Sequence, residues 1–91
     1  RGVRREFELV SLLRRAGKRF SRLSVGADGP LDGVTLKTAR VRDTYGVAVL
    51  AVRHGGTWTI APDGNQDVSA GDTLYAVGSR AGLAAFEEAV A

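Results

Sequence analysis

The segment from Val41 to Val52, VRDTYGVAVLAV, constrains the fold of this chain more than any other part of the sequence. A short charged turn and Gly46 lead into a continuous apolar run. Alternate residues of a regular strand point to opposite faces, which here gives the sets Val47, Val49, Ala51 and Ala48, Leu50, Val52. Neither set contains a polar residue, so both faces are expected to be covered. Residues 47–52 are therefore predicted to be a central strand of a sheet.

The residues before this strand predict two helices, a strand and a turn. Residues 3–16 carry a wide apolar stripe at helical spacing and are predicted to be a helix. Residues 19–25 are predicted to be a strand, followed by a turn-rich loop at 26–33. A short helix is expected at 35–39. Residues 41–45 are expected to form a turn.

The residues after the central strand predict two more strands and a final helix. His54, Gly55 and Gly56 close a hairpin into a strand at 57–60. The last strand is predicted at 73–77, and Ser79 is a suitable N-cap for a helix at 80–90. This order of elements predicts the α+β class, as a small two-layer domain with a mostly antiparallel sheet.

The composition excludes several kinds of site. The chain has no cysteine, so it can form no disulfide, thiolate metal site or thiol nucleophile. No apolar run approaches the roughly 20 residues that a membrane-spanning helix needs. The chain also has no methionine, which indicates a piece of a longer protein.

The positive charge is concentrated at the N-terminus. Residues 1–22 contain eight basic groups and two glutamates, which gives +6, and the remaining residues sum to −3. The basic character therefore belongs to the N-terminal segment.

Three side chains have both a functional and a structural interpretation. Arg42 could bind a phosphate through its planar donor fork, or pair with Asp43 or a loop carboxylate. Trp58 could stack on a nucleobase, but an anchor in the core or an interface is the preferred interpretation. His54 is interpreted as a solvent-facing residue of the hairpin turn.

The acidic residues do not predict a metal site. Asp63, Asn65 and Asp67 alternate like the start of a calcium loop, but no glutamate follows at the required distance. No nucleophile, base and orienting group can be assembled from the sequence, so the chain is predicted not to be an enzyme, with no catalytic residues and no metal.

Several ordered motifs resemble the TrkA C-terminal (RCK_C) domain family. They are PLDGVTLKTARVRDTYGVAVLAVRHGG, a following PD loop, AGDTLYAVGS and a last helix that contains FEE. The resemblance covers residues 19–91 as the regulatory domain and leaves residues 1–18 as a linker helix.

The resemblance implies a cytoplasmic regulatory, ligand-sensing and dimerisation domain of a potassium or other cation channel, transporter or cation/proton antiporter at the inner membrane. Members of the family form homodimers beside an upstream nucleotide-binding or membrane transport domain, and some bind cyclic di-AMP between the two copies. No other cofactor is implied. The matching ligand-binding positions here are Arg42, Val49, Leu50 and Pro62.

Two other functions are compatible with the sequence. One is a purely structural dimerisation module without a ligand. The other is a nucleic-acid-binding module, for which the basic N-terminal segment is the only argument. A basic segment beside a membrane protein is explained more simply by attraction to the anionic inner leaflet, so nucleic acid is predicted not to be a partner.

Overall fold

The computed structural model describes residues 8, 11 and 19–91. Their elements, in chain order, are β1 (Arg19–Ser24), β2 (Val34–Thr35), α2 (Leu36–Ala39), α3 (Val41–Tyr45), β3 (Ala48–His54), β4 (Thr57–Ile60), β5 (Asp67–Val68), β6 (Thr73–Gly78) and α4 (Arg80–Val90). The helix predicted at 3–16, and the linker at 1–18 to which it belongs, lie outside the part of the chain that the structure describes as an element.

The main sheet has four strands in the order β1-β6-β3-β4, and every neighbouring pair is antiparallel. β3 lies between β6 and β4, which confirms the prediction of a central strand. A second antiparallel sheet pairs β2 with β5, two residues each, and was not predicted, because strands so short carry no periodic pattern. The predicted α+β class with a mostly antiparallel sheet is confirmed.

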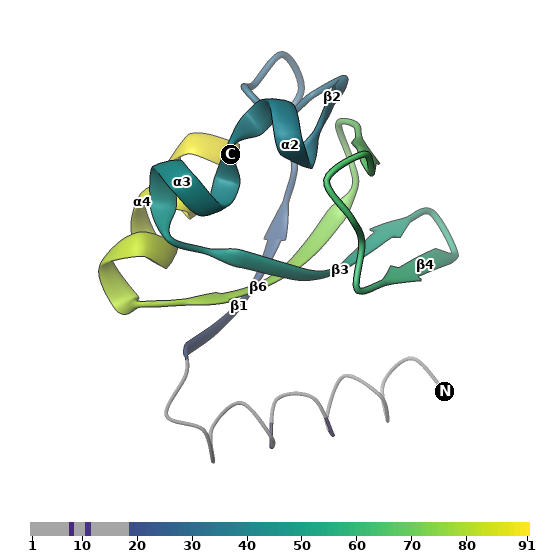
Figure 1. Cartoon of the computed structure of the whole chain (residues 1–91). Coiled ribbons are helices and arrows are strands. Elements are labelled where there is room, and N and C mark those ends of the chain that lie inside the picture. The colour runs from purple at the N-terminus through teal and green to yellow at the C-terminus, as the bar shows by residue number, and fades with distance from the viewer. Residues whose placement is uncertain (1–7, 9–10, 12–18) are drawn as a thin grey trace.

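Helices α3 and α4 pack over the same face of the main sheet (Figure 1). The stripe predicted for the last helix is buried there, with Leu83, Phe86 and Val90 at most 4% exposed. Leu74 and Ala76 of β6 face these side chains in the same core cluster. This burial of apolar surface is the main force that holds helices and sheet together.

The segment predicted as a turn at 41–45 is a short helix, α3. Arg40 precedes it in the left-handed conformation, with φ of 51°, and Gly46 ends it with φ of 66°. Both residues bend the chain sharply, so α3 can fit between α2 and β3. A glycine also permits the contact of α3 with α4, because a Cβ at Gly82 would lie 2.4 Å from the carbonyl oxygen of Tyr45.

A β-bulge in β3 changes which residues share a face. Val49 pairs with Ala76 of β6, and the next pair joins Ala51 to Tyr75, so Leu50 is an extra residue on the β3 side. The prediction that regular alternation continues through the strand is therefore wrong after Leu50. Ala51 lies on the face of Ala48, and Val52 lies on the face of Val49.

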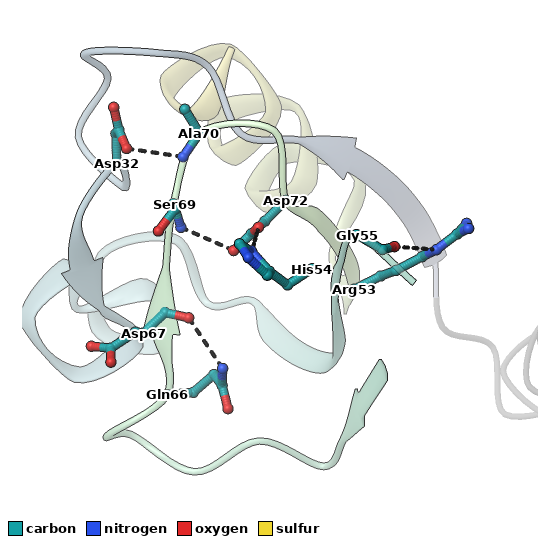
Figure 2. A network of polar contacts seen from close by, with 9 residues as sticks. All are labelled: Asp32, Arg53, His54, Gly55, Gln66, Asp67, Ser69, Ala70 and Asp72. Carbon is teal, nitrogen blue, oxygen red and sulfur yellow. Dashed lines mark hydrogen bonds and ion pairs between the residues drawn. The ribbon is translucent and has the colours of Figure 1, made fainter. Parts of the chain in front are cut away.

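A group of polar contacts fastens the hairpin β3–β4 to the turn before β6 (Figure 2). Asp72 is 3% exposed, and its carboxylate accepts the backbone N–H of Ser69 at 2.9 Å. The other carboxylate oxygen lies 2.5 Å from Nδ1 of His54. The His54 side chain is 74% exposed, as the solvent-facing interpretation requires, but it also closes over this buried carboxylate.

A second carboxylate joins two loops. Asp32 accepts the backbone N–H of Asp28 at 3.0 Å and that of Ala70 at 2.9 Å. These two hydrogen bonds hold the pKa of Asp32 below its ordinary value, and the bond from Asp28 has the larger effect. Because the bonds favour the ionised form, Asp32 stabilises the fold when it is charged.

Candidate functional site

One hollow of about 430 Å³ is lined by all four residues of the predicted binding site, which are Arg42, Val49, Leu50 and Pro62. We call it the apolar hollow, because its other lining residues are mostly hydrocarbon: Ala48, Ala51, Trp58, Ile60, Ala61 and Tyr75. Its volume falls in the usual range for a small-molecule site. The structure therefore brings all four predicted residues together.

Two backbone irregularities shape the wall of the apolar hollow. The bulge places Leu50 outside the regular ladder of β3. Ala61 has φ of 50°, and its N–H donates to the carbonyl oxygen of Leu50 at 2.8 Å. The left-handed conformation is costly for alanine and is further disfavoured before a proline, which here is Pro62. Strained backbone of this kind is common around binding sites.

Two members of an aromatic row, Trp58 and Tyr75, form another part of this wall. The ring of Trp58 stacks on Tyr75 with centroids 4.8 Å apart, and Phe20 lies 6.1 Å from Tyr75. The guanidinium of Arg53 lies 5.7 Å from the centre of the indole. The contact with Tyr75 agrees with the interpretation of Trp58 as an anchor. Sequence reasoning missed the row, although the Gly55-Gly56 turn fixes the pairing of Arg53 with Trp58.

Arg42 is exposed at the rim of the apolar hollow. Asp43, one of its suggested partners, instead pairs with Arg40 at 3.5 Å. Within the described part of the chain no ion pair involves Arg42, so its guanidinium can accept an outside anion. The hollow can thus bury a flat apolar group and bind a negative charge at its rim.

The acidic loop residues have a local role. Asp63 accepts the backbone N–H of Asn65 at 2.8 Å, which closes a turn in its own loop. Across residues 8, 11 and 19–91, no cluster of three or more histidine, aspartate or glutamate side chains is placed to hold a metal ion. No helix of these residues is long and apolar enough to cross a membrane.

Solved structures with the same fold include two complexes with cyclic di-AMP. One is the RCK_C domain dimer of BusR from S. agalactiae, with a TM-score of 0.73 and 20% identity, covering 78% of this chain and 93% of that chain. The other is the RCK C domain of the potassium transport protein KtrA, with a TM-score of 0.73 and 24% identity, covering 91% and 96%. At these sequence identities, the similarity shows only that this chain has the same fold as the two domains.

A third match corrects the prediction that nucleic acid is not a partner. S. agalactiae BusR in complex with its promoter DNA matches with a TM-score of 0.74 and 17% identity, covering 98% of this chain and 49% of that chain. Proteins with this domain fold therefore include one solved on DNA, and the exclusion is wrong. Its reasoning fails because duplex binding depends mainly on contacts between cations and phosphates, so a basic segment that suits an anionic membrane surface suits DNA equally well.

A search of curated protein sequences finds no match to this chain. The family model of the TrkA-C domain matches residues 20–91, which form most of the chain and contain the whole apolar hollow. TrkA-C domains are regulatory domains, and the one in KtrA belongs to a potassium transport protein. The chain belongs to the TrkA-C domain family.

Proposed function

We propose that this domain is the cytoplasmic ligand-sensing and dimerisation domain of a potassium or other cation channel, transporter or cation/proton antiporter at the inner membrane. The observation that carries the proposal is the apolar hollow, which combines an apolar floor with the exposed guanidinium of Arg42. The related domains of BusR and KtrA were solved with cyclic di-AMP, a ligand that has both bases and phosphates.

The proposed dimer uses the face of the sheet that carries the apolar hollow. Helices α3 and α4 pack on the other face. On the hollow side Ile60 is 49% exposed and Leu50 is half-buried. A second copy that covers these residues would remove apolar surface from water, which monomeric proteins rarely leave exposed in large patches. The RCK_C domain of BusR was solved as a dimer, which supports the pairing of two copies.

The proposed mechanism is a shift between two orientations of the paired domains. A ligand bound in the hollow, where the two copies of the domain meet, favours the orientation in which both copies contact it. The size of the shift equals the difference in its binding free energy between the two orientations. An upstream part of the longer protein then receives the change.

The test is calorimetry of the chain with cyclic di-AMP, with the oligomeric state followed by sedimentation. Removing the guanidinium in Arg42→Ala should cost about 1.5–3 kcal/mol of binding free energy, or roughly tenfold to hundredfold in affinity. Arg80→Ala is the matched control, because Arg80 is also exposed but lies on α4, outside the hollow.

Three results would count against parts of this proposal. If the chain is a monomer at micromolar concentration, the proposed dimer interface does not exist. A dimer without a ligand would leave a structural dimerisation module. If Arg42→Ala binds the ligand as tightly as the wild type, the anionic group of the ligand does not contact Arg42.

A further inference from the structure

A second, polar hollow adjoins the apolar hollow. It measures about 420 Å³ and shares Arg42, Ala48, Val49 and Pro62 with the first. The charged side chains that line it are Lys37, Arg40, Arg42, Asp43 and Asp63. Because four residues border both spaces, the two hollows lie side by side.

Two of the positively charged side chains that line the polar hollow are available to a ligand. Arg40 and Asp43 pair with each other at 3.5 Å. Asp63 keeps its negative charge, with one carboxylate oxygen accepting the backbone N–H of Asn65, so the three cations and two anions of the lining sum to +1. Lys37 and Arg42 form no ion pair within the described ranges of the chain. These two positive groups come from α2 and α3, on either side of Arg40.

The backbone holds Lys37 in place on the wall of the polar hollow. Its N–H donates to the carbonyl oxygen of Gly64 at 2.9 Å, and that of Leu36 donates to Gln66 at 3.1 Å. A Cβ at Gly64 would lie 3.2 Å from the Cβ of Lys37, so the loop packs closely against the base of the lysine side chain. The backbone and the base of this side chain are therefore fixed before a ligand binds, which removes part of the entropy cost of binding.

We propose that the two hollows form one site for a nucleoside phosphate with a terminal phosphate group. The base occupies the apolar hollow beside Trp58, and the phosphate lies between Lys37 and Arg42. A terminal phosphomonoester is doubly charged near neutral pH, because its second pKa is about 6. A cyclic phosphodiester carries a single charge on each phosphate and has no terminal group to enter the polar hollow. The inference rests on the proposed function, since it requires a ligand in the apolar hollow.

The experiment compares ligands that share a base and differ in whether the phosphate is a terminal group or is closed onto the 3′-hydroxyl. Calorimetry of the chain with AMP and with its 3′,5′-cyclic form, and with GMP and its cyclic form, isolates the terminal group for two bases. We expect the open form of at least one base to bind more tightly than its cyclic form. Lys37→Ala should lower the affinity for that open form by about tenfold to hundredfold, as expected for one charge-assisted hydrogen bond, and leave the cyclic form unaffected.

Two variants and one further ligand complete the test. Lys37→Arg should retain most of the affinity, and Arg80→Ala should retain all of it. Lys37 is exposed, so its variants are expected to fold, and their thermal unfolding verifies this. Inorganic phosphate alone should bind weakly, because it leaves the apolar hollow empty.

The outcomes separate this inference from the proposed function. Two results overturn the joint site of the two hollows and leave the sensing function standing. In the first, cyclic di-AMP binds, but neither open form binds more tightly than its cyclic form. In the second, an open form binds Lys37→Ala as well as it binds the wild type. Phosphate that binds as tightly as the nucleotides also overturns the joint site. If the chain binds no nucleotide of any kind, both proposals fail.

Discussion

Replacing Gly82 with alanine tests the packing that holds α3, and with it Arg42, against α4. A Cβ at this position would lie 2.4 Å from the carbonyl oxygen of Tyr45 and 3.0 Å from Oγ of Ser79. Ordinary contact distances begin at 3.4 Å, so the two helices must separate by about 1 Å. The obstacle at Tyr45 is a backbone atom, and no side-chain rotation can relieve it.

The expected cost follows from two opposing effects. Inserting a methyl group into a tight contact costs about 1–3 kcal/mol. Alanine recovers at most about 1 kcal/mol over glycine through its helix propensity. The upper part of the first range, about 2–3 kcal/mol, applies because the obstacle is a backbone atom at 2.4 Å. We therefore expect the free energy of unfolding to fall by about 1–2 kcal/mol, with a loss of about 4–8 °C in Tm for each kcal/mol in a domain of this size.

Urea unfolding at fixed protein concentration, followed by circular dichroism, measures this change. Gly56→Ala is the matched control, because a Cβ at Gly56 would meet no atom within 4 Å. The same substitution there should leave stability unchanged or raise it by up to about 1 kcal/mol. A Gly82→Ala chain as stable as the wild type would refute the proposed close packing.

Three further predictions concern the loops. Asp72→Ala should lower the free energy of unfolding by about 1–3 kcal/mol, because the N–H of Ser69 loses its buried acceptor, and urea unfolding with no change would contradict the role of Asp72. Asp32→Asn should destabilise the chain at neutral pH. Because the pKa of Asp32 is lowered in the fold, the wild-type advantage should vanish as the pH falls below 3.8, and a pH-independent difference in Tm would argue against this. At Ala61, where φ is 50°, calorimetric Tm values should rank glycine above alanine above valine, and any other order would show that no strain is present.

Much of the fold could be predicted because its apolar positions follow a clear period. The stripe of α4 and the strand β6 were found in this way. The bulge at Leu50 could not be found, since alanine, valine and leucine occupy both faces of β3 and a shift by one residue leaves the pattern equally apolar. The strands β2 and β5 were missed because pairs of two residues have no period.

The candidate site was predicted unevenly for a similar reason. The resemblance to a family identified Arg42, Val49, Leu50 and Pro62, and the structure gathers them around one hollow. Lys37 was not identified, because its place beside Gly64 depends on how the loop at 62–66 folds back on α2. No local pattern in the sequence encodes that contact.

The position of Trp58 gives the protein its own optical probe. It is the only tryptophan among the 91 residues, and its indole forms part of the wall of the apolar hollow. Indole emission responds to the polarity around the ring, so selectively excited fluorescence of this chain reports on the hollow without any label. A molecule that displaces water there should shift the emission maximum toward the blue. Occupancy can therefore be followed by titration in dilute solution, at an excitation wavelength that the two tyrosines do not absorb.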